Sequence, residues 1–236
     1  MLKFDKKIQK KALILIPARG GSSRVKNKNI RIVKNKPLIY WTILFAKKNS
    51  KGCDIVVSSD SNKIKKICFE NKVNFLNRPL KFSSNSAPMS DVINHALKHY
   101  EYKNKIYKYV ILLQPTSPIR EKNLIREGLE LLDKKKNFNV LYHLYNSKEF
   151  TGKLKKNSEF IPDYHINKRS QDISGKYIPT GNLFIYRASN FYQKKLVKKK
   201  YLGLVSKSTL WVNIDYEKDF CLLDGLIKKF PNLLKY

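Results

Sequence analysis

The stretch ALILIPARGGS at residues 12–22 passes directly from a short apolar run to a loop that carries an arginine and two glycines. A continuous apolar run that ends at such a loop is typical of a buried strand in a parallel sheet. Pro17 and Arg19 end the run too early for the apolar region of a signal peptide, which spans roughly 7–15 residues. We therefore predict a buried strand at Leu13–Ile16, preceded by a basic, solvated leader at residues 1–11.

The same pattern of an apolar run followed by a polar loop occurs twice more. One run, at 54–59, ends at Asp60, and another, at 109–113, leads into the loop QPTSPI. Segments with apolar residues at helical spacing follow the runs, at 37–47, 62–71, 90–100 and 122–134. Ser90 or Asp91 is expected near the N-cap of the third helix. Strands that alternate with helices predict a doubly wound, mostly parallel α/β sheet, whose ligands bind beyond the carboxyl ends of the strands.

The remaining segments are shorter or less regular. Further strands are predicted at 73–76, 182–186 and 212–214, and a closing amphipathic helix at 217–229. Residues 137–176 are polar and rich in tyrosine, and we interpret them as an excursion from the sheet. The sequence shows no internal repeat and no linker typical of disorder. We therefore expect a single domain from residue 12 to residue 236, with an inserted subregion at about 137–180.

Length and composition exclude several classes of protein. The chain has 236 residues, of which 42% are hydrophobic, and this is enough for one α/β domain with a proper core. No apolar run approaches the roughly 18 residues that a membrane-spanning helix needs. The cysteines, Cys53, Cys68 and Cys221, are odd in number and lack Cys-x-x-Cys spacing. They are typical of reduced thiols in the cytoplasm, so neither a disulfide framework nor a structural zinc site is expected.

The charge is strongly basic, with a formal net value of +31. One interpretation is a surface for nucleic acid or anionic membrane, and the other is compositional drift toward lysine, as in an A+T-rich genome. The chain has 41 lysines but only 8 arginines, and the lysines are spread along its whole length. Nucleic-acid readers favour arginine for its planar, bidentate guanidinium, so we favour drift over a nucleic-acid surface. A positive shell would still help to collect an anionic small substrate.

Two local patterns suggest ligand binding. The loop RGGSSR at 19–24 combines glycines, which let backbone N–H groups approach a phosphate, with arginines that supply positive charge. It matches neither the P-loop nor the dinucleotide-binding fingerprint. His95 and His99 stand four residues apart on a predicted helix, but the residues between them are Ala-Leu-Lys, with no glutamate, so we favour a partly exposed helix face over a metal site. No Ser/His/Asp or Cys/His arrangement indicates nucleophilic catalysis.

Five motifs, in order and at compatible spacing, resemble the N-acylneuraminate cytidylyltransferases, also called CMP-sialic acid synthetases. They are IPARGGS at 16–22 with Lys28 and Asn29, VVSSD at 56–60, LQPTSPIR at 113–120, RSQD at 169–172 with Tyr177 and Gly181, and NID at 213–215 with Asp219. The LQPTSPIR loop matches the family's pattern almost letter for letter. The resemblance covers roughly residues 12–229, and it rests on all five motifs, since the glycine loop alone is weak evidence.

The resemblance implies a fold like that of the nucleotide-diphospho-sugar transferases and a dimeric, cytoplasmic enzyme. Such an enzyme transfers CMP from CTP to the anomeric hydroxyl of a nine-carbon 2-keto sugar acid and releases pyrophosphate, with Mg²⁺ as cofactor. It further implies that the inserted subregion serves dimerisation and closure over the sugar. Other keto-deoxy sugar acids, of the legionaminic, pseudaminic or octulosonic type, are alternative substrates. A weakened or non-catalytic homologue that binds anionic partners through its basic surface is a second alternative.

Roles are carried over residue by residue from the family's motifs. The catalytic positions are Arg19, Lys28 and Asp215. The nucleotide would be bound by Arg19, Gly20, Gly21, Ser22, Lys28, Asn29, Arg78 and Gln114. The sugar acid would be bound by Gln114, Thr116, Ser117, Arg169, Gln171, Tyr177 and Gly181, with Arg169 acting on the sugar carboxylate or from a neighbouring subunit. The metal would be held by Asp215 and Asn213. In the alternative interpretation, Arg169 and Gln171 lie in a solvated loop and Asp215 is a helix N-cap.

The chain also departs from the family's pattern. Ser23 replaces a lysine, with Arg24 as a neighbouring substitute, Lys26 and Asn27 replace a proline and a small residue, Thr180 replaces an asparagine, and Asn85 stands where aspartate is common. Asn213 replaces the first acidic residue of the Asp-Ile-Asp motif. Its carbonyl oxygen can coordinate Mg²⁺, but it brings no negative charge and cannot act as a base.

Overall fold

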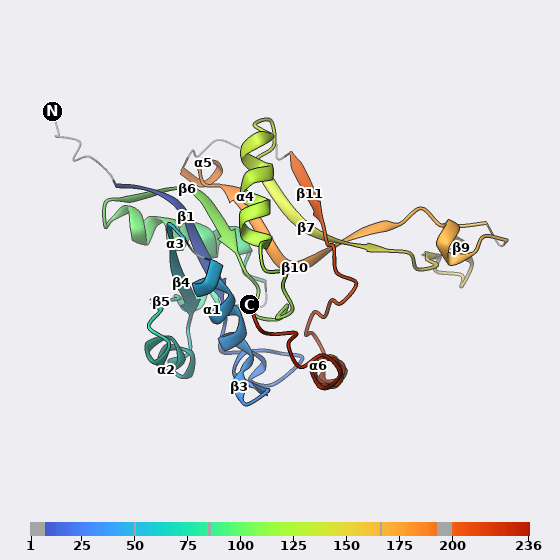
Figure 1. Cartoon of the computed structure of the whole chain (residues 1–236), viewed down its shortest axis with the longest axis horizontal. Coiled ribbons are helices and arrows are strands. Elements are labelled where there is room, and N and C mark those ends of the chain that lie inside the picture. The colour runs from blue at the N-terminus through green and yellow to red at the C-terminus, as the bar shows by residue number, and fades with distance from the viewer. Residues whose placement is uncertain (1–7, 50, 85, 166, 193–199) are drawn as a thin grey trace.

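The structure is a computed structural model that describes residues 8–49, 51–84, 86–165, 167–192 and 200–236. Its core is a seven-stranded sheet with the strand order β11-β7-β10-β6-β1-β4-β5 (Figure 1). The strands are β1 (Ile8–Pro17), β4 (Cys53–Ser59), β5 (Asn74–Asn77), β6 (Lys105–Leu112), β7 (Val140–Ser147), β10 (Lys176–Arg187) and β11 (Tyr201–Val205). Strand β10 runs antiparallel to both of its neighbours, and all other pairs are parallel. The predicted mostly parallel α/β sheet is confirmed.

Helices cover both faces of this sheet. They are α1 (Leu38–Asn49), α2 (Asn62–Glu70), α3 (Met89–Glu101), α4 (Leu124–Lys134), α5 (Ser189–Tyr192) and α6 (Glu217–Lys229). Short 3-10 turns are η1 (Lys28–Ile30), η2 (Leu80–Phe82) and η3 (Ser170–Asp172), and two small hairpins join β2 (Ile32–Val33) to β3 (Lys36–Pro37) and β8 (Gly152–Leu154) to β9 (Phe160–Pro162). In the part of the chain that the structure describes, no helix is long and apolar enough to cross a membrane.

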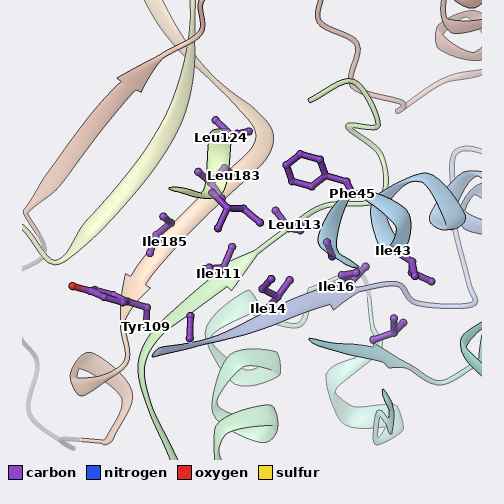
Figure 2. Packing of buried hydrophobic residues seen from close by; sticks show 14 of the residues in the cluster. Ile14, Ile16, Ile43, Phe45, Tyr109, Ile111, Leu113, Leu124, Leu183 and Ile185 are labelled. Atoms are coloured by element: carbon purple, nitrogen blue, oxygen red, sulfur yellow. The ribbon is translucent and has the colours of Figure 1, made fainter. Parts of the chain in front are cut away.

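The side chains of β1 point alternately to two separate cores, as the pleat of a strand requires. Ile14 and Ile16 pack with helices α1, α2 and α4 on one face, where Phe45 and Leu124 close the layer (Figure 2). Leu13 and Leu15 pack with α3 on the opposite face. A strand that is buried on both faces needs a continuous apolar run, and this explains the run at 12–16.

A third, smaller core fixes the C-terminal segment beside the sheet. Phe220 and Leu223 of α6 pack with Trp41 of α1 and with Val212 and Ile214. The Trp41 indole also donates a hydrogen bond to the carbonyl of Val33. Because this core anchors both sides of residues 212–220, the polar side chains within that segment have fixed positions.

Two boundaries in the first half of the chain differ from the prediction. Strand β1 begins at Ile8, so residues 8–11 of the predicted solvated leader are part of the sheet. They form a strand because β6 begins at Lys105 and pairs with them. Residues 1–7 of that leader lie outside the described residues. Helix α3 begins at Met89, one residue before the predicted start, with Pro88 as its N-cap, and Ser90 and Asp91 lie in its first turn, near the cap as predicted.

The second half of the chain departs further from the prediction. Strand β7 belongs to the central sheet, although residues from 137 onward were expected to leave it. Strand β11, which was not predicted, pairs with β7 at the edge. Residues 148–175, with the β8–β9 hairpin, project from the body beyond the ends of β7 and β10, and we call them the arm (Figure 1). The strand predicted at 212–214 is absent from the structure, where these described residues form an extended segment with one backbone bond, from Ile214 N–H to the Thr116 carbonyl.

Candidate active site

Two adjoining pockets lie at the carboxyl ends of β1, β5 and β6, where a doubly wound sheet places its ligands. The first has a volume of about 340 Å³ and is lined by Arg19, Ser22, Ser23, Arg24, Lys28 and Asp215. The second has a volume of about 200 Å³ and is lined by Pro17, Arg19, Ser22, Lys28, Asn29, Arg78, Met89, Gln114, Pro115 and Thr116. The first is lined mainly by cations and hydroxyls, which suits phosphate groups, and the second has a mixed polar and apolar lining.

The glycine loop after β1 is held in place by its neighbours. The backbone N–H of Gly20 donates a hydrogen bond of 2.7 Å to Asp60 Oδ1 at the end of β4. A Cβ at Gly20 would lie 2.8 Å from the Cβ of Ser61, so a side chain does not fit there without movement. Gly21, in contrast, faces open space. Asn29 donates to the carbonyl of Arg19 at 3.0 Å, so it both supports the loop and lines the second pocket.

Arg78 is a buried cation in the wall of the second pocket. Its Nε and Nη2 donate to the hydroxyl and the carbonyl of Ser58, at 3.1 and 2.6 Å. Burial lowers the pKa of Arg78 to about 10; Asp60 acts in the opposite direction, and the nearby positive charge of Arg19 adds to the decrease. The guanidinium still carries its charge at neutral pH, so it adds to the positive potential of the pocket.

Lys28 and Asp215 join the glycine loop to the C-terminal segment. Lys28 is only 8% exposed, and its Nζ donates to the Ile214 carbonyl at 2.6 Å and to Asp215 Oδ1 at 3.1 Å. The same Oδ1 lies 3.3 Å from Nη1 of Arg24. Two cations from the loop therefore share one carboxylate, and all three side chains line the first pocket.

Asn213 occupies the position where the family has its first aspartate, and it contacts Asp215 directly. Its Nδ2 donates to Asp215 Oδ2 at 2.9 Å, and its Oδ1 lies 3.1 Å from the Ser117 hydroxyl. The two side chains meet as expected, although the segment is not a strand. Asp215 is not a helix N-cap, because the carboxylate of Asp219 accepts the backbone N–H groups of both Asp215 and Tyr216 at 2.7 Å.

The donor set at this position offers oxygen ligands but few charges. Asp215 supplies a carboxylate and Asn213 a carboxamide oxygen, which are ligands that Mg²⁺ accepts. Over the described ranges of the chain, no three His, Cys, Asp or Glu side chains are grouped to hold a metal ion. Mg²⁺ is commonly held by one or two carboxylates together with the phosphates of a substrate. The residues present therefore fit a metal ion that binds together with a polyphosphate.

Gln114 and Gly181 are in close contact on the other side of the pockets. Gly181 has a φ of +75°, and a Cβ there would lie 2.4 Å from Gln114 Oε1 and 2.5 Å from Ser117 Oγ. Only glycine combines this backbone conformation with such close packing. Ser117 is fully buried and bonds to the Thr180 carbonyl at 2.9 Å, so it supports the loop instead of lining a pocket. Thr116 and Gln114 do line the second pocket.

The remaining residues assigned to the sugar acid are not brought to the pockets within this chain. Arg169 and Gln171 lie on the arm, and Tyr177 lies in the part of β10 that pairs next to it (Figure 1). Arg169 forms an exposed ion pair with Asp172, at 2.9 Å between Nε and Oδ2. Tyr177 is 56% exposed. In one copy of the chain, these three residues are on the surface.

Sequence reasoning missed three residues that shape the site. Asp60 ends a predicted strand and the VVSSD motif and was given no role, but it accepts the Gly20 N–H. Met89 was placed before the predicted helix, whereas it begins α3 and lines the second pocket. Arg120 closes the LQPTSPIR motif and has no assigned role, yet it is buried behind the loop. The motifs could have directed attention to Asp60 and Arg120, whereas the position of Met89 in the pocket depends on the fold.

Comparisons with known proteins show the family to which the chain belongs. The family model "Cytidylyltransferase" matches residues 13–205, and the chain belongs to this family. It is 26% identical to an N-acylneuraminate cytidylyltransferase from Escherichia coli over 89% of this chain and 50% of the relative. It is 27% identical to a pseudaminic acid cytidylyltransferase from Campylobacter jejuni over 89% and 93% of the two chains. The family predicted from the motifs is confirmed.

Solved structures agree on the fold. The structure of CMP:2-keto-3-deoxy-manno-octonic acid synthetase complexed with CTP aligns with a TM-score of 0.67 and 14% identity, covering 93% of this chain and 99% of that one. A 4-diphosphocytidyl-2C-methyl-D-erythritol synthase from Anaerococcus prevotii aligns with a TM-score of 0.63 and 12% identity, covering 93% and 96%. The chain spans about half the length of the N-acylneuraminate cytidylyltransferases that it matches.

Proposed function

We propose that this protein transfers CMP from CTP to the anomeric hydroxyl of a sialic-acid-type 2-keto sugar acid and releases pyrophosphate. The observation that carries the proposal is the first pocket, in which Arg19, Arg24 and Lys28 surround the space in front of the glycine loop. The family match supports a cytidine nucleotide as the donor. Relatives named for N-acylneuraminate, pseudaminic acid and legionaminic acid support a nine-carbon sugar acid as the acceptor.

In this proposal the cations of the first pocket bind the triphosphate. The sugar hydroxyl oxygen attacks the α-phosphorus, the bond from this phosphorus to the bridging oxygen breaks, the pyrophosphate leaves with the bonding electron pair, and the hydroxyl proton passes to solvent water. Negative charge then grows on the phosphoryl oxygens and on the departing pyrophosphate, and fixed cations stabilise it. Arg19 and Lys28 line both pockets, so they are placed to contact the phosphates beside the acceptor. Gln114 and Thr116, in the second pocket, offer an amide and a hydroxyl to the cytidine or the sugar.

We propose Mg²⁺ as the cofactor, held by Asp215 and Asn213 together with phosphate oxygens. When bound, Mg²⁺ supplies positive charge that neutralises the leaving pyrophosphate. Asp215 is positioned for this role by Lys28 and Arg24, which hold its carboxylate at the edge of the first pocket. Asn213 fixes the other oxygen of the same carboxylate through its Nδ2. We further propose a cytoplasmic location, because the three cysteines are odd in number and lack the spacing of a disulfide framework or a zinc site.

Nucleotide choice tests the proposed function. The purified protein is incubated with CTP, ATP, GTP or UTP, with Mg²⁺ and a panel of eight- and nine-carbon keto sugar acids, and pyrophosphate release is measured. We expect release with CTP and at least one nine-carbon acid, and little release with the other nucleotides. Equal release from all four nucleotides, or none with CTP and any acid, would contradict the proposal. A preference for an eight-carbon acid would move the assignment to the octulosonic type.

We also propose that the protein forms a homodimer through the arm. Several large apolar side chains are exposed on the arm and on the adjoining end of β10: Phe150, Leu154, Phe160, Ile161, Tyr177 and Ile178. An exposed apolar cluster of this kind is typical of a protein interface. A second copy is the proposed partner, because Arg169 and Gln171 could then reach the partner's pocket, which they do not reach within one chain.

The arm interface predicts a change in mass after a single substitution. Phe160→Asp places a charge in the apolar cluster and is expected to convert a dimer into a monomer in light scattering coupled to size exclusion. Phe69→Asp is the matched control, because Phe69 is 87% exposed on α2, away from the arm. It should leave the mass unchanged. A native chain that is monomeric at micromolar concentration, or a Phe160→Asp variant that stays dimeric, would contradict the arm interface.

A further inference from the structure

Arg120 is a buried cation directly behind the Gln114 loop. It is 6% exposed, and within the described ranges no carboxylate forms an ion pair with it. Burial lowers its pKa to about 10, so the guanidinium is still charged at neutral pH. An isolated charge in a protein interior is costly unless hydrogen bonds replace its lost hydration. The fold therefore retains Arg120 at a cost, and its contacts indicate why.

Several parts of the fold supply acceptors for Arg120, and one of them is the hydroxyl of Tyr236, which hydrogen-bonds with the guanidinium. Its Nη2 donates to the Gln114 carbonyl at 2.7 Å, and its Nε donates to the Asn182 carbonyl at 3.0 Å. Its Nη1 donates to the Thr42 hydroxyl on α1 at 2.9 Å. The guanidinium also lies over the ring of Phe45, with 5.4 Å to the ring centroid. The planar fork of arginine can serve three acceptors in fixed directions, which an ammonium group cannot do.

These contacts connect the two sides of the pocket wall. Gln114 belongs to the loop after β6, and Asn182 follows Gly181 on β10. Gln114 and Gly181 pack so tightly that no Cβ fits between them, and the Gln114 N–H faces the Gly181 carbonyl at 3.4 Å. Arg120 holds the backbone of both segments from behind. The position of the Gln114 side chain in the pocket therefore depends on this guanidinium.

We propose that Arg120 is a positioning residue that fixes Gln114 against Gly181 and so sets the affinity of the pocket for its substrates. It does not line either pocket, and it acts on a ligand only through Gln114. The inference rests on the proposed function, because Gln114 is taken to contact the cytidine or the sugar acid. A merely structural arginine would stabilise the fold without this selective effect on binding.

The chain contains a matched control in Arg187, the last residue of β10. Arg187 also donates to two backbone carbonyls, those of Phe138 at 2.8 Å and Leu132 at 2.6 Å, and contacts one hydroxyl, that of Tyr109, at 3.1 Å. Its guanidinium also lies over an aromatic ring, that of Tyr109. Arg187→Met thus removes the same kinds of bond as Arg120→Met, but from a place that does not contact the Gln114 loop.

The experiment compares Arg120→Met, Arg187→Met and Gln114→Ala by thermal melting, by calorimetric binding of CTP, and by kcat and KM for both substrates. We expect both arginine variants to lose stability, but only Arg120→Met to weaken the binding or raise the KM of the substrate that contacts Gln114, by about ten-fold beyond the control. Arg120→Lys should recover only part of this loss. In the double variant, Arg120→Met should add little to the effect of Gln114→Ala on that substrate, because both act through one side chain.

The outcomes separate the inference from the proposed function. Equal effects of Arg120→Met and Arg187→Met on substrate binding, or fully additive effects of Arg120→Met and Gln114→Ala, would overturn the positioning role. A native chain that binds no CTP would instead overturn the proposed function. If Arg120→Met does not fold, Arg120→Lys and Thr42→Val carry the same comparison, since each keeps part of the contact set. In that case an unchanged affinity and KM in Arg120→Lys would overturn the inference.

Discussion

Arg19→Ala is expected to lower turnover with CTP roughly 10²-fold or more, the effect typical of losing a group that stabilises transition-state charge. Arg19 follows the first buried strand and lines both pockets, so a triphosphate bound at the glycine loop would lie beside its guanidinium. Arg19→Lys should recover only part of the activity, because an ammonium group lacks the planar, bidentate fork. Steady-state rates of pyrophosphate release at saturating sugar acid, with CTP varied, give this comparison directly.

The control for this prediction is an arginine that lines neither pocket. Arg31 forms an exposed ion pair with Glu217 and stacks over the ring of Phe220. Arg31→Ala removes one positive charge from the protein and should change turnover little. If it lowered turnover as much as Arg19→Ala does, the general positive field of the protein would be responsible. Normal kinetics in Arg19→Ala would show that the loop does not bind the triphosphate.

The first half of the fold was predictable because its strands are buried on both faces. The continuous apolar runs at 13–16, 55–57 and 109–112 lie in β1, β4 and β6. Strands β7 and β11 lie toward the sheet edge and bury only part of their side chains, so their sequences lack such a run. Strand β11 alternates between half-buried and exposed positions, and it is a strand because β7 offers hydrogen bonds to it.

From residue patterns alone, without the family resemblance, the site was predictable only where one motif contains all of its parts. The glycine loop and the QPTS loop were placed correctly at strand ends because each directly follows an apolar run. The bond between Lys28 and Asp215 joins residues 187 positions apart, and the contact of Gln114 with Gly181 depends on an antiparallel strand that returns beside β6. No periodicity in the sequence indicates such pairs. The same limit applies to the arm, where Arg169 lies within a recognisable motif but far from the pockets of its own chain.

Asp215→Asn is expected to abolish most of the activity, and added Mg²⁺ should restore only part of it. Asp215 is the single carboxylate among the side chains that line the first pocket, where Lys28 and Arg24 both contact it. The amide would leave Lys28, which is largely buried, without its counter-charge, and it would remove the one charged ligand proposed for the metal. Pyrophosphate release measured over a range of Mg²⁺ concentrations tests both effects. Unchanged activity in this variant would remove Asp215 from the mechanism.

Asn213→Asp tests the same position in the opposite direction, because it restores the second carboxylate of the family's motif. In the native chain, Nδ2 of Asn213 donates to Asp215 Oδ2 at 2.9 Å, so the substitution replaces a hydrogen bond with two carboxylates in contact. Without metal they repel each other, and the melting temperature should fall. With Mg²⁺ the pair offers two charged ligands, so the melting temperature should rise on titration more steeply than in the native chain. The Mg²⁺ concentration for half-maximal turnover should also decrease. A variant whose stability and turnover respond to Mg²⁺ as the native chain does would show that residue 213 does not contact the metal.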